Sequence, residues 1–342
     1  MQHSEPGRFF NSLRRLSAAL FASSFVLLAA KAHAGTSPQF TEYDIPTEKS
    51  NANDITLGAD GNMWFIESDS HKVARITASG KISEFDVPTK NGLEFIQRGP
   101  KGELWFNEFA TGKIWSISMS GVIQGYPVPS TVSYGLAFGS DGNMWFGSTD
   151  RDAIGRMKPD GTIAEFPLPE PRRAPAGMAA AKDQSIWFVE DYDPYGGLGR
   201  ITTQGKIAEY PFHPKPPIEA RTKDEIGSGF GELAIATDGN VWFTEPYLNR
   251  IARRSATGTV AEYAVPTSKS RPVNVVAGTN SDVWFTEAQG NKFGHVTAQG
   301  KITEYNIPTP SRFLGGIALD ANGNVWVVEN SANKILKASM PH

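Results

Sequence analysis

The sequence predicts an all-β protein, a seven-bladed β-propeller, on three observations. A Trp followed by an aromatic residue or Val recurs at spacings of 41, 40, 42, 55, 42 and 42 residues, usually with Glu three positions after the Trp. Each repeat divides into four short β-type runs between Gly-rich turns, which is typical of propeller blades. The last repeat lacks its fourth run, and a matching segment stands before the first repeat. The marker residues are Trp64, Trp105, Trp145, Trp187, Trp242, Trp284 and Trp326.

The third repeat illustrates how each blade is expected to fold. Its first two strands flank Asp141-Gly142-Asn143, a tight turn that needs residues tolerant of positive φ. Asp160-Gly161 supplies a second turn, and Pro169 then ends the sheet because proline cannot donate a ladder hydrogen bond. β-branched strands and Gly turns exclude the helical solenoids that share this repeat length. The predicted strands are 135–139, 144–148, 153–157 and 163–168.

The two ends of the chain predict how the ring closes. The last repeat has runs at 317–319, 325–328 and 335–338 but no fourth run. The segment 40–46, Phe-Thr-Glu-Tyr-Asp-Ile-Pro, matches the fourth run of the other repeats, such as 302–308. We therefore expect this N-terminal strand to complete the C-terminal blade, which would cover an otherwise exposed sheet edge.

The first 34 residues carry the features of a secretory signal. Arg8, Arg14 and Arg15 form a basic start, an apolar stretch follows over 18–30, and Ala32-His33-Ala34 is a small-x-small cleavage site. The apolar stretch is shorter than the roughly 20 residues that cross a bilayer. We therefore expect cleavage before Gly35, a periplasmic or secreted protein without a membrane span in the mature chain, and one propeller domain over 35–342.

Composition excludes several kinds of site. The chain has no Cys, so disulfides, zinc-thiolate sites, iron–sulfur clusters and cysteine nucleophiles are all excluded. A formal net charge of −3 and the lack of a long basic run argue against nucleic-acid binding. We expect a monomer whose partner is a small molecule or a peptide.

Function is expected on the face formed by the loops that lead into each first strand and those between second and third strands. The turns of the opposite face are short and stereotyped, whereas this face carries the variation. The spacing of 55 places an insertion at about 213–228, and the loop 190–197, which contains Tyr192, is two residues longer than its counterpart in the first blade. These segments are either tolerated surface insertions or a lid over the central opening.

The repeats carry framework motifs of one known family. The motifs are Gly-Asn-Met-Trp-Phe at 142–146, Val-Trp-Phe-Thr-Glu at 241–245 and 283–287, Asn-Lys-Phe-Gly at 291–294, and Ile-Thr-Glu-Tyr-Asn-Ile-Pro-Thr-Pro at 302–310. With these motifs the whole mature chain resembles the streptogramin B lyase (virginiamycin B lyase) family. The resemblance implies a β-elimination that opens a cyclic depsipeptide at its ester bond. It also implies a His base and two Glu that hold magnesium, all on the last blade.

The family pattern matches the last blade only in part. Glu329 stands where the family has its second metal-binding Glu, three residues after the Trp. Gly315 stands in place of the His, eleven residues before the Trp, and Phe313 in place of the first Glu, thirteen before it. In the preceding blade, the family's Arg-Pro-His is replaced by Arg271-Pro272-Val273. Glycine cannot abstract a proton and a Phe side chain cannot bind a cation, so the match covers the framework and not the lyase site.

Six of the seven repeats share a Glu three residues after the Trp, and two interpretations of it stay open. Each Glu could accept hydrogen bonds from backbone amides of the next loop, with Asn249, Asn291 and Asn333 taking part. Alternatively, the set could form an acidic ring that binds a divalent cation, with Glu329 and Glu287 as the metal-ligand candidates and magnesium as the implied ion. The six are Glu67, Glu108, Glu190, Glu245, Glu287 and Glu329.

The remaining catalytic candidates lie where the family has its base, eleven residues before the Trp of their own blades. Glu94 and Tyr134 occupy this position on adjacent blades and could form a relocated acid–base pair. Two functions therefore stay open: a ligand-binding or scaffold propeller without the lyase site, or an enzyme with relocated rim residues, either a carbon–oxygen lyase or a metal-dependent lactone hydrolase. The expected ligand-binding residues of the rim are Asn53, Glu94, Tyr134, Tyr192, Arg271 and Asn274.

Overall fold

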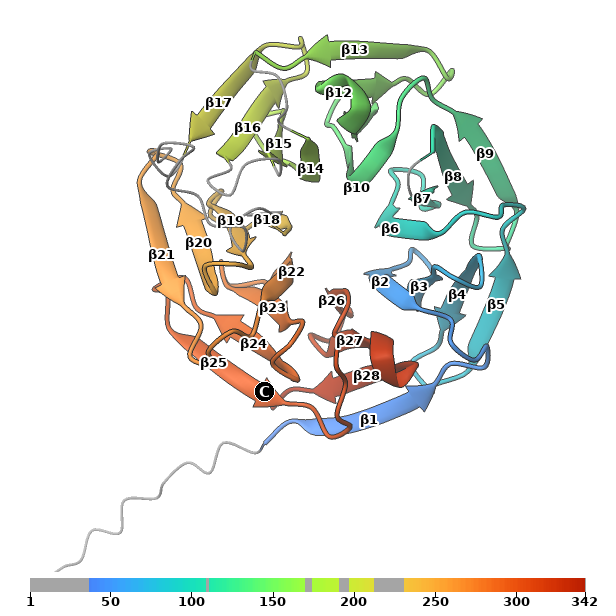
Figure 1. Ribbon diagram of the computed structural model, residues 1–342, viewed down its shortest axis with the longest axis vertical. Helices are drawn as coiled ribbons and strands as arrows, with labels where there is room; N and C mark the ends of the chain where they lie inside the picture. The colour runs from blue at the N-terminus through green and yellow to red at the C-terminus, as the bar shows by residue number, and fades with distance from the viewer. Residues whose placement is uncertain (1–36, 109–110, 170–173, 191–196, 212–230, 342) are drawn as a thin grey trace, which may run out of the picture. The chain divides into compact units, whose positions relative to one another are not determined.

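The computed structural model describes residues 37–108, 111–169, 174–190, 197–211 and 231–341. In these residues, seven four-stranded antiparallel sheets are arranged around a central opening (Figure 1). The predicted seven-bladed propeller is confirmed. The predicted secretory signal 1–34 and the insertion 213–228 lie outside the described residues.

Each blade runs from an innermost strand beside the opening to an outermost strand at the periphery (Figure 1). The innermost strands are β2 (Ala52–Leu57), β6 (Leu93–Arg98), β10 (Val132–Phe138), β14 (Pro175–Ala180), β18 (Leu233–Ile235), β22 (Pro272–Ala277) and β26 (Ile317–Leu319). The second strands are β3 (Met63–Glu67), β7 (Leu104–Glu108), β11 (Met144–Ser148), β15 (Ser185–Glu190), β19 (Val241–Glu245), β23 (Val283–Glu287) and β27 (Val325–Glu329). The third strands are β4 (Lys72–Ile76), β8 (Lys113–Ile117), β12 (Ala153–Met157), β16 (Gly197–Thr202), β20 (Arg250–Arg254), β24 (Lys292–Val296) and β28 (Lys334–Ser339). The outermost strands are β5 (Ile82–Asp86), β9 (Ile123–Pro127), β13 (Ile163–Pro167), β17 (Ile207–Pro211), β21 (Val260–Ala264), β25 (Ile302–Asn306) and β1 (Gln39–Asp44).

The ring closes with the N-terminal strand, as the repeat pattern predicts. β1 pairs antiparallel with β28, with Phe40 opposite Ala338 and Tyr43 opposite Ile335. The last blade therefore has the same four strands as the others, and the edge of β28 is covered. Two single-turn 3₁₀ helices, Thr149–Arg151 and Asn330–Ala332, follow the second strands of blades three and seven.

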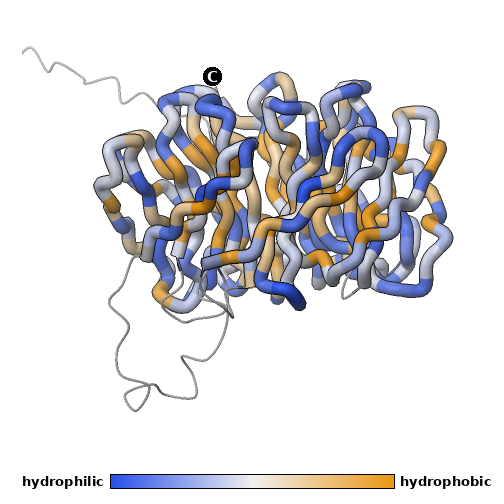
Figure 2. Tube along the Cα trace, turned by 90° about the horizontal axis from the view of Figure 1, so that it is seen from above, coloured by the Kyte–Doolittle hydropathy of each residue, from blue (hydrophilic) through white to orange (hydrophobic). Residues whose placement is uncertain are grey.

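Neighbouring blades pack through the marker tryptophans, which are buried between the sheets except for the half-buried Trp105. Trp326 of the last blade packs with Ile55 of the first, and its ring stacks on Tyr43 with 6.0 Å between the ring centroids. An aromatic residue of that size removes roughly 150–250 Å² from water, which stabilises the fold by about 4–6 kcal/mol. Seen from the edge of the ring, polar loops lie at both faces and apolar stretches lie between them (Figure 2).

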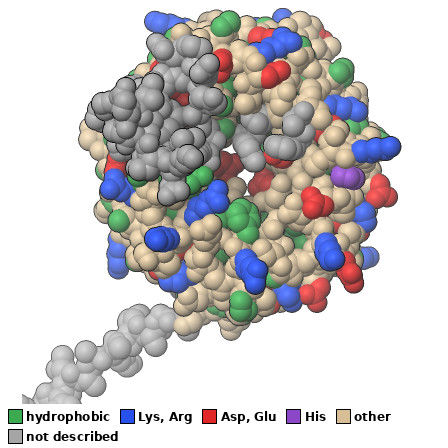
Figure 3. Space-filling model, in the orientation of Figure 1, with side chains coloured by type: hydrophobic (Ala, Val, Ile, Leu, Met, Phe, Trp, Pro, Cys, Tyr) green, Lys and Arg blue, Asp and Glu red, His purple; other side chains and the backbone are tan. Residues whose placement is uncertain are grey.

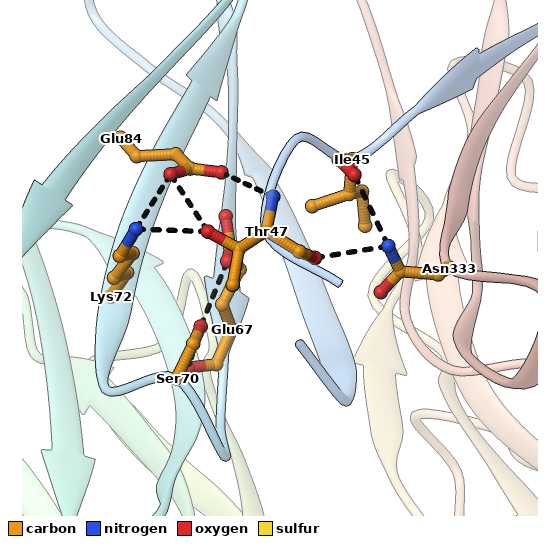
Figure 4. A network of polar contacts seen from close by, with 7 residues as sticks. All are labelled: Ile45, Thr47, Glu67, Ser70, Lys72, Glu84 and Asn333. Carbon is orange, nitrogen blue, oxygen red and sulfur yellow. Dashed lines mark hydrogen bonds and ion pairs between the residues drawn. The ribbon is translucent and has the colours of Figure 1, made fainter. Parts of the chain in front are cut away.

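The loop that leads into the first blade is bound from both sides (Figure 4). The amide of Asn333 in the last blade donates to the carbonyl oxygens of Ile45 and Thr47, at 3.2 and 3.0 Å. Thr47 in turn donates its backbone N–H and its hydroxyl to the Glu84 carboxylate, at 3.0 and 2.9 Å, and Lys72 pairs with the same carboxylate at 2.7 Å. Equivalent sets bind the two preceding loops: Asn249, Thr267, Glu304 and Lys292, and Asn291, Thr309, Glu42 and Lys334.

No helix in the described part of the chain is long and apolar enough to cross a membrane.

Candidate functional site

Irregular pairing in the innermost strands shapes the walls of the central opening. The ladder between the first and second strands skips two residues in blades one, two and six. Such bulges re-aim side chains at the end of a strand. The residues left out lie eleven and ten positions before each Trp: Asn53 and Asp54, Glu94 and Phe95, and Val273 and Asn274.

These residues line a cavity of about 300 Å³, which we call the rim cavity. Pro246, in a loop between second and third strands, and Arg271, in a loop leading into a first strand, also line it. The cavity therefore lies on the face where the sequence predicts function. Figure 3 shows acidic side chains beside the opening on the face in view. Among the described residues, the charged ones that line the cavity are Asp54, Glu94, Glu232 and Arg271.

A second cavity of about 350 Å³ lies along the same opening and is lined by residues of the innermost strands β2, β6, β14, β18, β22 and β26. Asp54, Phe95 and Glu232 line both cavities. Glu232 immediately precedes β18 of blade five, and Asp54 lies in β2 of blade one. We call Asp54 and Glu232 the carboxyl pair; they form the floor of the rim cavity, where the two cavities meet.

Each member of the carboxyl pair is anchored to the blade that follows its own. Asp54 accepts hydrogen bonds from the backbone N–H groups of Ile55 and Ile96, at 2.9 and 2.8 Å. Glu232 accepts one from the amide of Asn274, at 3.2 Å. Burial raises the pKa of both carboxyls, and the negative charge of Asp54 raises the pKa of Glu232 further. The pair therefore retains a proton at pH values where exposed carboxyls have lost theirs.

Four of the six residues expected at the rim line this one cavity: Asn53, Glu94, Arg271 and Asn274. Asn53 donates its amide N–H to the carbonyl oxygen of Leu93 at 3.0 Å, and buried Glu94 accepts from Asn107 at 3.4 Å. Tyr134 belongs to β10 by its backbone, but its side chain lies outside what the structure describes, as does all of Tyr192.

The carboxyl pair is not among the site residues that the sequence predicts. Both residues lie ten positions before a marker Trp. The family's base lies one residue earlier, eleven positions before the Trp. Ten positions before the Trp, the other blades have Phe95, Gly135, Gly177, Asn274 and Gly316. An acidic residue at this position in two blades, where the other blades have Gly, Asn or Phe, is the sequence signal that could have revealed the pair.

Phe313 and Gly315 also line the rim cavity, at the places where the resemblance implies a Glu and a His. Gly315 lies against blade one: a Cβ added there would stand 2.5 Å from the carbonyl oxygen of Asn53. The neighbouring Gly316 donates its N–H to that same oxygen at 2.7 Å. Any side chain at position 315 would therefore require the two blades to move apart.

Glu329 and Glu287, the metal-ligand candidates, are fully buried and are not among the residues that line the rim cavity. Burial and the nearby Glu42 carboxylate raise the pKa of Glu329 to about 8. Burial and Glu304 raise the pKa of Glu287 to about 7 in the same way. Neither carboxylate has a partner in hydrogen-bond geometry among the described residues, although the Ser270 hydroxyl lies beside Glu287.

These residues do not fit the magnesium ion that the resemblance implies. Magnesium takes oxygen ligands in near-octahedral geometry, but Phe313 offers none from its side chain. Among the described residues, the unpartnered carboxylate of Glu329 recurs at Glu287, in a blade to which the family pattern assigns no ion, so the lack of a partner does not by itself mark a metal position. In the ranges that the structure describes, no cluster of three or more His, Asp or Glu side chains could hold a metal.

Comparisons with known proteins agree with the framework motifs. A profile of the virginiamycin B lyase family matches residues 29–224 and 219–341. A virginiamycin B lyase from Nocardia farcinica (strain IFM 10152) is 28% identical over 215 residues, which cover 63% of this chain and 71% of that protein.

Solved structures give the same result over most of the chain. A streptogramin B lyase has a TM-score of 0.79 and 33% identity, and covers 90% of this chain and 100% of its own. A catalytically inactive histidine-to-alanine variant of virginiamycin B lyase from Staphylococcus aureus, solved with quinupristin, has a TM-score of 0.76 and 31% identity over 88% of this chain. The chain belongs to the virginiamycin B lyase family.

Proposed function

We propose that this chain is an exported, ligand-binding member of the family whose rim cavity binds a small molecule or peptide without the family's lyase chemistry. The observation that carries the proposal is the pair Phe313 and Gly315, which line the cavity at the places of the implied metal ligand and base. The pattern of a basic start, an apolar stretch and Ala32-His33-Ala34 supports export.

The chemistry of β-elimination supports this proposal. The reaction needs a base for the proton α to the carbonyl and a cation to polarise that carbonyl. Gly315 offers no base, and its close approach to Asn53 leaves no space for one. The Staphylococcus aureus variant without one histidine is described as catalytically inactive, and this chain has no histidine at the implied base position. A positioned base typically contributes 10²–10⁴-fold to the rate, about 3–5 kcal/mol of the barrier.

Incubation with quinupristin tests the proposal. The purified protein and a family lyase are each mixed with the antibiotic, with and without magnesium, and the products are separated by chromatography. Elimination conserves mass, so retention time and fragmentation must distinguish the linear product from the ring. We expect ring opening by the family lyase and none above the buffer control by this chain. Magnesium-dependent opening at a rate comparable with the family lyase would refute the proposal.

The carboxyl pair supports a second candidate, an enzyme with relocated residues. Carboxyls held at raised pKa by burial serve as general acids or bases near neutral pH, and Asp54 and Glu232 lie at the floor of the cavity. Glu94 lines the same cavity, and Tyr134 is the other residue expected to take part. A carbon–oxygen lyase or lactone hydrolase of this kind would turn over a lactone panel, and Asp54→Asn or Glu232→Gln would abolish the turnover.

A further inference from the structure

The charges of the rim cavity are separated along its depth. The carboxyl pair lies at the floor, because Asp54 and Glu232 also line the second cavity. Arg271 lines only the rim cavity, and its guanidinium carbon lies 5.7 Å from the ring centroid of Tyr247, which is 49% exposed. The guanidinium is therefore near the outer surface. A ligand in this cavity meets acidic groups at the inner end and a guanidinium at the outer end.

Two buried polar atoms of the cavity residues have no hydrogen-bond partner in the part of the chain that the structure describes. The Nε–H of Arg271 and the amide oxygen of Asn53 are buried, and neither has a hydrogen-bond partner among the described residues. Buried polar groups are normally satisfied, so such atoms point to a missing partner. The Arg271 group needs an acceptor such as a carboxylate, and the Asn53 oxygen needs a donor such as an ammonium or amide N–H.

The walls and size of the cavity limit the ligand further. Val273 and Phe313 supply apolar surface in the rim cavity alone, and Phe95 supplies apolar surface at the floor beside the carboxyl pair. A volume of about 300 Å³ is at the small end of the range for ligand pockets, roughly 300–1,000 Å³. Phe313 therefore has a role in this chain as a contact surface where the family pattern has a carboxylate.

We propose that the rim cavity binds a small zwitterion of the amino-acid or dipeptide class. The ammonium lies at the carboxyl pair, the carboxylate lies toward Arg271, and an apolar side chain packs against Phe95 and Phe313. Glu94, which also lines the cavity, adds to the negative potential around the ammonium. This inference rests on the proposed function and specifies the ligand class of the same site.

Matched ligands test each charge without altering the protein. Isothermal titration calorimetry of the mature chain is carried out with L-leucine and leucyl-leucine, with L-leucinamide, which lacks the carboxylate, and with N-acetyl-L-leucine, which lacks the ammonium. Calcium chloride alone is a further arm. We expect leucine or leucyl-leucine to bind at least about tenfold more tightly than either blocked compound, since each lost charge contact corresponds to 1.4 kcal/mol or more.

Variants of the cavity residues test which of them contact the ammonium of the ligand and which contact its carboxylate. Glu232→Gln and Asp54→Asn should weaken binding of the zwitterion at least about tenfold, and Arg271→Gln should do the same while leaving leucinamide unchanged. Glu48→Gln, an exposed carboxylate outside the cavity, is the control and should bind like the unaltered chain. Near-ultraviolet circular dichroism of every variant shows whether it is folded.

Three results would overturn the inference: equal affinity for leucine and leucinamide, binding of calcium but of none of the amino compounds, or binding of none of the probes. None of these results depends on a variant, and none bears on ring opening of quinupristin. The quinupristin assay therefore tests the proposed function independently of the ligand class.

Discussion

Blades two and seven place a buried glutamate at the same point, three residues after the Trp, yet the two carboxylates are in opposite electrostatic environments. Glu108 accepts the indole N–H of Trp115 at 2.8 Å, the Thr111 hydroxyl at 2.8 Å and the Asn91 amide at 3.1 Å. Burial alone would raise the pKa of Glu108, but these donors outweigh it and lower the pKa. Glu329 has no such donors among the described residues, and burial together with Glu42 raises its pKa to about 8.

The outermost strand causes the difference. Blade seven has Glu42 in β1, whereas the corresponding residue of blade two is Gly125 in β9. A Cβ at Gly125 would lie 2.8 Å from the Trp115 ring, so the glycine makes room for the indole that donates to Glu108 and stabilises its ionised form. Thus a Glu that recurs in the repeats does not by itself indicate a metal ligand, because the outermost strand of its blade decides whether the carboxyl is ionised.

Removing the strand that closes the ring should have the largest effect on the stability of the protein. Deleting residues 35–47 takes away β1, including Glu42, and exposes the edge of β28. We expect a loss of about 4 kcal/mol or more, seen as a lower melting temperature in calorimetry and as aggregation in light scattering. Glu42→Gln keeps the strand and is the control. Unchanged melting and solubility of the deletion would show that the chain closes in another way.

The next largest effect is expected in blade two. Trp115→Phe removes the indole donor from buried Glu108 and leaves a small cavity, which should cost about 2–3 kcal/mol in urea unfolding. Trp105→Phe is a matched control, because the indole of half-buried Trp105 donates to half-buried Glu103 at 2.9 Å. A cost for Trp115→Phe no greater than for the control would contradict the role assigned to the indole.

Blade seven predicts a stability that falls as pH rises. The folded-state pKa of Glu329, about 8, is above its ordinary value of 4.5, so its contribution is complete below pH 4.5 and is lost as pH rises toward 8. Glu329→Gln mimics the protonated form. We expect the variant to gain roughly 2–4 °C in melting temperature over the unaltered chain between pH 5 and pH 8. A parallel pH dependence of the two proteins would contradict the raised pKa.

In blade two, the contribution of Glu108 to stability should rise with pH, in the opposite direction to blade seven and by a smaller amount. The pKa of Glu108 is lowered, so its contribution is present above its ordinary value of 4.5 and is lost as pH falls below it. Glu108→Gln should therefore destabilise the protein at neutral pH by about 1 kcal/mol and less in acid. A variant that is equally destabilised at pH 7 and in acid would show that packing, and not charge, sets the cost.

Most of the fold could be predicted because the determinants of a blade are local. The Trp and the Asp-Gly-Asn turn recur together, since the turn's Asp accepts the indole N–H, as Asp60 does from Trp64 at 3.1 Å. Three strands of the third blade begin where the pattern places them; β10 begins at Val132, three residues before the expected run, because the ladder is irregular between Ser133 and Leu136.

The site was less predictable because its determinants lie between blades. Asp54 is anchored by the N–H of Ile96, 42 residues away, and no pattern within one repeat announces that contact. In the sequence, Trp115 is only a Trp that does not belong to the repeated marker positions. Its hydrogen bond to Glu108 depends on Gly125 in the next strand. Sequence spacing located the radial positions, but the bulge of blade one leaves both Asn53 and Asp54 out of the ladder, and it is Asp54 that lies at the floor of the cavity.

Single-turnover conditions show whether this family framework lacks the family's elimination. The mature chain is held at a concentration equal to that of quinupristin, with magnesium present, and the linear product is followed by chromatography over many hours. Slow release of product cannot hide a chemical step in this experiment. We expect the antibiotic to be recovered as the intact ring. Linear product that forms only when both protein and magnesium are present would contradict this expectation.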